Sequence, residues 1–231
     1  MSVCLSLGTS TQHVCACLEA MEPGTEMAEI RVDLLSDPED LARCFHKAKQ
    51  LGIKTIATVR DEQGFTSQRQ SRAMACLAAG CTYIDVEVEA PKAYQDAIVS
   101  QAKKVGVVVI ISHHNYEQQE SSSMGLDLVI KECFEKGADV AKVAVAVCSS
   151  QGAARVLATY AEASNGNLVA IGMGGFGKVT RLSCLALGSP FSFASWDAGS
   201  ATAPGQLTRS EMHLGLGLLG GGGGNKKVKQ G

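Results

Sequence analysis

The sequence predicts an α/β protein, a single-domain (β/α)8 TIM barrel over residues 1–219 with a glycine-rich, disordered tail over residues 220–231. Short aliphatic runs alternate with amphipathic stretches along most of the chain, which is the pattern of parallel strands linked by helices. The 231 residues also suit one such barrel, and no change in composition marks a domain boundary. An open doubly wound sheet is the alternative, but its first strand–helix turn usually carries a glycine fingerprint that this turn lacks.

Strands and helices alternate through the first half of the chain. Residues 27–35 have one aliphatic face and one face with Glu29, Arg31 and Asp33, which is typical of a strand. Asp37, placed before a proline, is the expected N-cap of a helix to about residue 50. Apolar periodicity and flanking caps or glycines place the other strands at 2–7, 53–59 and 83–88 and the other helices at about 11–21, 69–79 and 91–104.

The second half contains continuous aliphatic runs, which suit parallel strands covered by helices. Residues 105–112 form one such run and lead into His113 and His114. Residues 137–147 form another run, with Lys142 inside it. The remaining expected elements are helices at 124–136 and 150–163, strands at 168–172 and 191–194, a short helix that contains Arg181, and a final helix from about residue 206.

Composition narrows the classes of partner. The net charge of -2 and the scattered basic residues argue against nucleic acid or an anionic membrane, so a small-molecule substrate is expected. No apolar run approaches the ~20 residues of a membrane span and no signal segment is recognisable, so we expect a cytoplasmic protein. The nine cysteines are an odd number without a CxxC pair, which predicts buried thiols rather than disulfides or a zinc site.

Lys142 is the first candidate for chemistry because it interrupts an aliphatic strand. A lysine almost never sits fully buried without a partner, and desolvation disfavours its charged form and lowers its pKa towards the neutral amine that a nucleophile requires. We therefore interpret Lys142 as a candidate Schiff-base former. The alternative is a lysine at a strand end whose ammonium reaches solvent.

Polar residues at the C-terminal ends of the strands complete the expected site, because barrel enzymes carry their active sites there. A histidine near a lysine imine suits proton transfer at the neighbouring carbon, and arginines suit a carboxylate substrate; this chemistry needs no metal or cofactor. Alternatives stay open: the acids as counter-ions of arginines, the histidine as a cap, Arg181 as a surface residue. The loop at 172–177 resembles a phosphate cradle only weakly. The candidates are Glu29, Arg31, Arg60, Asp85, Glu87, His114, Lys142 and Arg181.

Several short segments together resemble the type I 3-dehydroquinate dehydratases of the shikimate pathway, in order and nearly throughout the chain up to Gln206. They are Glu29-Ile-Arg31-Val-Asp33, Thr58-Val-Arg60, Ser112-His-His114-Asn-Tyr116, the run from Gly137 through Lys142 to Val145, Gly177-Lys-Val-Thr-Arg181-Leu and Ala203-Pro-Gly-Gln206.

The resemblance implies a lyase of aromatic amino acid biosynthesis that dehydrates 3-dehydroquinate to 3-dehydroshikimate. It implies that Lys142 forms a Schiff base with the C3 ketone, and that His114 removes the C2 proton and helps the C1 hydroxyl to leave. It implies that Arg181 clamps the substrate carboxylate. The residues implied in substrate binding are Glu29, Arg31, Arg60, Arg181, Thr202 and Gln206, and Ser6 and Glu62 are tentative additions.

The sequence departs from the family in places. Thr202 stands where the family has serine; its hydroxyl can make the same hydrogen bond, but its χ1 is stiffer. The segment after Arg60 is shorter than the family's and leaves Glu62 or Gln63 as the partner of His114. We favour Glu62 because a carboxylate can orient and charge-stabilise a histidine. The segment between Phe193 and Thr202, which closes over the substrate in the family, is longer here.

Competing functions stay open alongside the dehydratase. One is a Schiff-base aldolase-like barrel that acts on phosphorylated sugars. Another is a non-catalytic homologue that binds the metabolite as a sensor, although a sensor needs neither the lysine nor the histidine. The oligomeric state stays open, with a homodimer as one alternative, as does fusion to another pathway enzyme.

Overall fold

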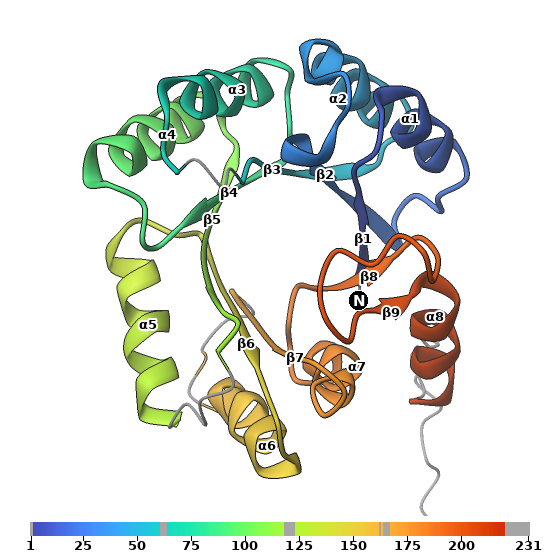
Figure 1. The fold of residues 1–231 in the computed structure, drawn as a ribbon, viewed down its shortest axis with the longest axis vertical. Coiled ribbons are helices and arrows are strands. Elements are labelled where there is room, and N and C mark those ends of the chain that lie inside the picture. Colours follow the sequence, from blue (N-terminus) through green and yellow to red (C-terminus); the bar gives the residue numbers. More distant parts are fainter. Residues whose placement is uncertain (1, 61–63, 118–122, 162, 164–166, 220–231) are drawn as a thin grey trace, which may run out of the picture.

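The computed structural model describes residues 2–60, 64–117, 123–161, 163 and 167–219. In these residues one parallel sheet of nine strands, in the order β7-β6-β5-β4-β3-β2-β1-β8-β9, curls around a central space, with the helices outside it (Figure 1). The predicted α/β barrel is therefore confirmed. The strands are β1 (Ser2–Leu7), β2 (Glu26–Arg31), β3 (Lys54–Thr58), β4 (Tyr83–Glu87), β5 (Val108–Asn115), β6 (Val140–Ala146), β7 (Leu168–Met173), β8 (Phe191–Ser195) and β9 (Leu207–Thr208).

The outer layer consists of helices that follow the strands one by one. Several begin at a hydroxyl cap: the side chains of Ser10, Thr66, Ser149 and Thr208 each accept a backbone N–H three residues later. The α-helices are α1 (Thr11–Glu19), α2 (Leu41–Gln50), α3 (Ser67–Ala78), α4 (Lys92–Val105), α5 (Ser123–Glu135), α6 (Ser150–Ala158), α7 (Lys178–Ala186) and α8 (Arg209–Leu218), and the 3-10 helices are η1 (Val32–Leu34), η2 (Pro38–Asp40) and η3 (Thr159–Ala161).

Strand alternation separates the two cores of the molecule. In β2, Ala28 and Ile30 are fully buried and belong to the hydrophobic core, whereas Glu29 lines a cavity inside the barrel. Aromatic side chains pack in the barrel interior, where the ring of Phe191 lies 5.7 Å from that of Tyr83 and 5.6 Å from that of Phe193. All nine cysteines are free thiols and, except Cys148, buried.

Some predicted boundaries are wrong, and the contacts explain why. β2 ends at Arg31 rather than at residue 35, because Asp33 turns back to bind the Arg31 guanidinium and residues 32–34 form η1. Asp37 does not cap α2: its carboxylate instead accepts hydrogen bonds from the backbone N–H and the hydroxyl of Thr11, at 2.9 and 2.6 Å. The short strand β9 also precedes the last helix, which begins at Arg209 and not near residue 206.

The barrel has a seam. Among the described residues, the ladder of paired strands ends at β7, and β8 pairs with β1 and β9 instead of β7. Two side-chain hydroxyls accept hydrogen bonds from backbone N–H groups of β7. The Tyr160 hydroxyl accepts from the Ala170 N–H at 2.7 Å, and the Thr180 hydroxyl accepts from the Gly172 N–H at 2.8 Å. Both residues are buried, so protein hydroxyls rather than water hydrogen-bond these strand groups.

No helix in the described ranges is long and apolar enough to cross a membrane.

Candidate active site

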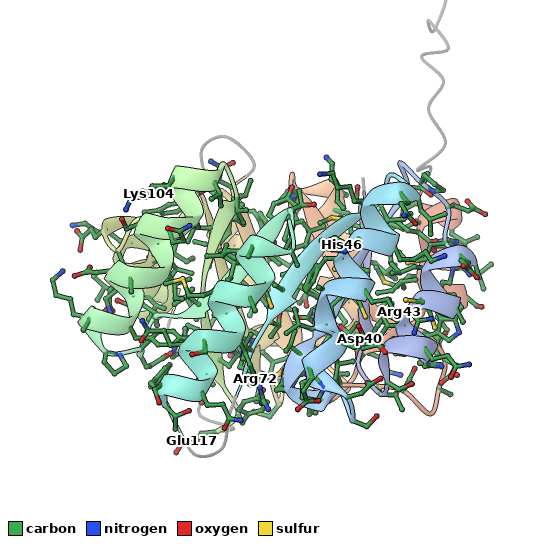
Figure 2. All side chains as sticks on the ribbon, turned by 90° about the horizontal axis from the view of Figure 1, so that it is seen from above. Asp40, Arg43, His46, Arg72, Lys104 and Glu117 are labelled. Carbon is green, nitrogen blue, oxygen red and sulfur yellow. The ribbon has the colours of Figure 1, made fainter. Side chains whose placement is uncertain are left out.

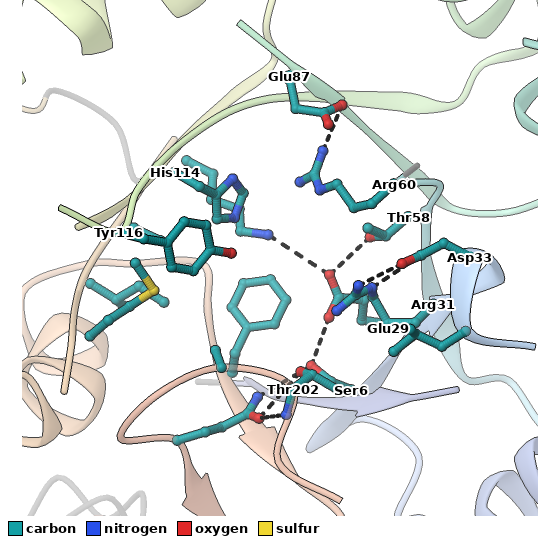
Figure 3. A pocket seen from close by; sticks show the side chains of 18 of the residues that line it. Ser6, Glu29, Arg31, Asp33, Thr58, Arg60, Glu87, His114, Tyr116 and Thr202 are labelled. Carbon is teal, nitrogen blue, oxygen red and sulfur yellow. Dashed lines mark hydrogen bonds and ion pairs between the residues drawn. The ribbon is translucent and has the colours of Figure 1, made fainter. Parts of the chain in front are cut away.

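A cavity of about 870 Å³ opens at the C-terminal ends of the strands, where barrels carry their active sites (Figure 3). The structure brings most of the predicted residues together in its lining. Asp85 lies just beneath the lining, and Glu62, like its alternative Gln63, lies outside the described residues. The predicted residues in the lining are Ser6, Glu29, Arg31, Arg60, Glu87, His114, Lys142, Arg181, Thr202 and Gln206.

Lys142 projects from β6 into the cavity and is buried, as predicted, but it is not an isolated amine. Its Nζ lies 2.9 Å from Asp85 Oδ2 and 3.8 Å from Glu29 Oε1, and 4.3 Å from the centre of the Phe193 ring. Lys142 therefore has the partners that a buried lysine almost always requires. The two carboxylates stabilise positive charge on this nitrogen, and the aromatic face adds a cation–π contact.

Asp85 links Lys142 to a chain of buried charges. Its Oδ1 accepts hydrogen bonds from Arg60 at 2.7 Å and from the Ser112 hydroxyl at 2.5 Å. Arg60 also pairs with Glu87 at 2.7 Å, and Glu87 in turn binds Arg69. Burial would raise the pKa of Asp85, but the charges of Arg60 and Lys142 outweigh it and hold that pKa far below its usual range. Asp85 is thus a fixed negative charge. The interpretation of Asp85 and Glu87 as counter-ions of Arg31 and Arg60 agrees with the contacts of Arg60, whereas Arg31 pairs with Asp33.

Glu29 is the second carboxylate beside the lysine. The Ser6 hydroxyl donates to its Oε2 at 2.7 Å and the Thr58 hydroxyl to its Oε1 at 2.9 Å (Figure 3). Burial acts to raise the pKa of Glu29, but the nearby Lys142 and Arg31 charges and the Ser6 hydrogen bond lower it below the ordinary value. The ionised carboxylate is held rigidly from two neighbouring strands.

His114 lies near the end of β5, on the face that points into the barrel, and lines the cavity. Burial, together with the positive charges of Arg60 and Lys142, lowers the pKa of His114 well below its ordinary value, so the ring is neutral near pH 7. The Tyr116 ring stacks on it with the centroids 6.3 Å apart (Figure 3). His113 points the other way and pairs with Glu89, outside the cavity lining.

The inner arginines differ in whether they already hold a carboxylate. Arg31 is bound by both oxygens of Asp33, at 3.1 and 2.6 Å, and Arg60 is held between Asp85 and Glu87. Within the part of the chain that the structure describes, Arg181 has no acidic partner: its guanidinium donates to the Pro204 carbonyl at 3.3 Å, and its Nε is buried without a hydrogen-bond partner. Burial lowers the pKa of Arg181 to about 10. Of these three, Arg181 is the one free to bind a substrate anion.

The loop before α8 closes one side of the cavity. Gly205 takes a positive φ of 69°, and a Cβ there would lie 2.2 Å from the Gly174 carbonyl oxygen, so only glycine fits this approach. The Gln206 Oε1 accepts from the Thr202 N–H at 2.8 Å, and its Nε2 donates to the Ser6 hydroxyl at 3.3 Å. The loop thereby places Thr202 and Gln206 on the cavity.

Sequence reasoning missed several lining or supporting residues. Ser112 lies two residues before His114 in β5, and Phe193 lies two residues after Phe191 in β8. Residues two apart in a strand point to the same face, so strand alternation could have indicated both. Tyr116, for which the sequence predicted no role, also lines the cavity. Arg72 and Gln68 of α3 also reach the lining, and no signal in the helix distinguishes them from surface residues.

Comparison with known proteins gives a consistent relationship. The sequence profile of the type I 3-dehydroquinases matches residues 3–222. The chain is 31% identical over 207 residues to 3-dehydroquinate dehydratase from Methanosarcina acetivorans, covering 84% of this chain and 85% of that one. It is 32% identical over 202 residues to the 3-dehydroquinate dehydratase of Methanococcus maripaludis, covering 82% and 85% of the two chains.

Solved structures agree with the sequence matches. The crystal structure of 3-dehydroquinate dehydratase from Aquifex aeolicus superposes with a TM-score of 0.79 at 26% identity, and the match covers 94% of this chain and 97% of that one. Because the family profile spans nearly the whole barrel, the chain belongs to the type I 3-dehydroquinase family.

Proposed function

We propose that this chain dehydrates 3-dehydroquinate to 3-dehydroshikimate through a Schiff base on Lys142. One observation carries the proposal: a buried lysine, a neutral histidine and an arginine without an acidic partner all line one cavity. These are the nucleophile, the base and the anion clamp that elimination of water from a hydroxy keto acid needs.

The reaction divides between two residues. The Lys142 amine attacks the C3 ketone, and loss of water leaves an iminium that withdraws electrons from C2. His114 removes the C2 proton, the C1 hydroxyl leaves as water after receiving a proton from the same imidazole, and water then hydrolyses the iminium to release the product. Family membership supports this division of roles, and the neutral state of His114 suits a base.

The charges around the lysine favour the cationic intermediate. Asp85 and Glu29 face the nitrogen of Lys142 whether it is an ammonium or an iminium, so the positive charge keeps its partners as the bond forms. Because the pKa values of both carboxyls lie below their ordinary values, they stay ionised during the reaction. This is electrostatic stabilisation that is in place before the substrate arrives.

Arg181 is the proposed carboxylate clamp, with Gln206, Thr202 and Ser6 around the substrate's hydroxyl groups. The unpaired buried guanidinium supports this choice, since a bidentate carboxylate would supply the partner that its Nε lacks. Glu62 as the partner of His114 stays a prediction.

The aldolase alternative needs a phosphate site, and three backbone amides of the glycine loop after β7 already donate to acceptors within the protein. The Gly172 N–H donates to Thr180, the Gly174 N–H to the Pro204 carbonyl and the Gly177 N–H to the Gly174 carbonyl. These amides are therefore occupied rather than available to phosphate oxygens. The sensor alternative gives no reason for the buried Lys142 beside His114.

Reductive trapping tests the mechanism. Borohydride added with 3-dehydroquinate should inactivate the enzyme irreversibly, because reduction converts the transient imine into a stable secondary amine. Peptide mapping should find the substrate mass on the peptide with Lys142, and the conjugated enone product should absorb in the ultraviolet without borohydride. Normal turnover by Lys142→Ala, or trapping on another lysine such as the exposed Lys92, would refute the assignment.

A homodimer and a cytoplasmic location stay predictions from the sequence and the family. Size-exclusion chromatography with light scattering checks the first.

A further inference from the structure

The cavity extends beyond the reacting groups. Its volume of about 870 Å³ could hold on the order of 30 water molecules, more than a single six-membered ring acid fills. Its lining includes Asp33 and Leu34 of η1 and, from α3, Gln68 and Arg72. Gln68 and Arg72 are four residues apart, so they share one face of the helix.

Arg72 stands out among the cations of the cavity. Arg31, Arg60 and Lys142 each hold at least one carboxylate, as described above. Arg72 is half-buried, and among the described residues no side chain forms an ion pair or hydrogen bond with it. Asp33 also lines the cavity, but Arg31 occupies both of its carboxylate oxygens.

Two arginines therefore lack an acidic partner in one cavity, Arg181 and Arg72. They differ in depth, because Arg181 is 1% exposed and Arg72 is half-buried. Figure 2 places Arg72 at the end of the barrel where Glu117 follows β5, and opposite the end with Lys104. Arg72 thus lies in the outer part of the cavity lining, and Arg181 lies deeper in the same cavity.

We propose that Arg72 forms an outer anion subsite, which captures the carboxylate of the hydroxy acid substrate in the outer part of the cavity and passes it to Arg181. This inference rests on the proposed dehydratase function. A fixed positive charge in the outer part of a cavity raises the local concentration of an anion and its association rate, and salt screens this effect. The deep groups carry the chemistry and do not depend on Arg72.

The test compares wild type, Arg72→Gln and Arg72→Lys with Arg43→Gln as the matched control. Arg43 is an exposed arginine of α2, and its side chain does not line the cavity. At an ionic strength of about 0.02 M, Arg72→Gln should lower kcat/KM for 3-dehydroquinate roughly 3- to 10-fold, with kcat nearly unchanged. Arg72→Lys should retain most of the wild-type kcat/KM, because it keeps the charge.

Salt separates this role from a structural one. At about 0.5 M salt the difference between Arg72→Gln and wild type should shrink to less than about 2-fold, since the Debye length falls to a few ångströms. If Arg72→Gln has the same kcat/KM as wild type or as Arg43→Gln at low salt, the subsite is overturned. A loss in the kcat of Arg72→Gln that salt does not change would also overturn it. Wild type that fails to convert 3-dehydroquinate would instead overturn the proposed function, and the subsite with it.

Discussion

Replacement of Arg181 by methionine should stabilise the fold while it removes activity. Burial lowers the pKa of Arg181 from its ordinary value to about 10, which corresponds to about 3 kcal/mol of free energy against the charged form in the folded state. The folded-state pKa of Arg181 lies below the unfolded-state pKa, so this penalty is fully present below about pH 10 and disappears as the pH rises from there to the unfolded-state pKa. Methionine keeps an apolar stem of similar length, and the loss of the hydrogen bond to Pro204 offsets part of the gain.

The expected result is a gain of about 1–3 kcal/mol in the free energy of unfolding, or roughly 2–10 °C in Tm for a chain of this size. Arg181→Met should lose about 2–5 kcal/mol of transition-state stabilisation, which lowers kcat/KM roughly 30- to 5,000-fold. Calorimetry at pH 6 and pH 9 should give the same difference in Tm, because the arginine is charged in both states at both pH values.

Either half of this result can refute its premise. A clear loss of Tm in Arg181→Met would mean that the buried guanidinium is not an uncompensated charge in the free protein. Unchanged kcat/KM would remove Arg181 as the carboxylate clamp. Arg43→Met serves as the control, since this exposed arginine should change neither quantity by more than about 0.5 kcal/mol.

Two further outcomes follow from the buried charges. His114→Ala should lose roughly 10²- to 10⁴-fold in kcat yet still form the borohydride-trapped adduct, while His113→Ala should stay near wild type in a product assay. Because the His114 pKa is lowered, the acid limb of the wild-type pH–rate profile should lie below pH 6.5, and a limb above it would contradict the neutral base. Asp85→Asn should lower the free energy of unfolding in urea by about 3–5 kcal/mol, because it leaves Arg60 and Lys142 buried without the carboxylate that they share. The half-exposed Glu89 should tolerate the same type of change, Glu89→Gln. Equal stability of the two carboxamide variants would refute the network.

The sequence predicted the strands well because each one carries its own local signal. The continuous aliphatic run of β6 and the alternation around Glu29 are independent of the rest of the fold. The boundary at residue 35 was wrong because alternation continues through residues 32–34 while the ion pair of Arg31 and Asp33 bends the chain. A local pattern does not contain a side-chain contact that competes with the strand.

The candidate site was predicted in its membership but not in its pairing. Strand ends converge in any barrel, so listing their polar residues found Lys142, His114 and Arg181 together. Which cation holds which anion depends on register between neighbouring strands, and this separated Arg60, bound on both sides, from Arg181, bound to no acid. Arg72 comes from a helix, where no rule about strand ends applies.

The seam between β7 and β8 leaves one place around the barrel, among the described residues, without a ladder of paired strands. In a fully hydrogen-bonded barrel, the stagger of the strands fixes the radius. Here the Tyr160 and Thr180 hydroxyls occupy β7 backbone groups, so β8 can move relative to β7 without breaking a ladder hydrogen bond. Met173 of β7 and Phe193 of β8 line the cavity on the two sides of this seam. Any change in barrel diameter around a bound ring is therefore expected at this seam, because the strands that carry Lys142 and His114 are joined by a continuous ladder.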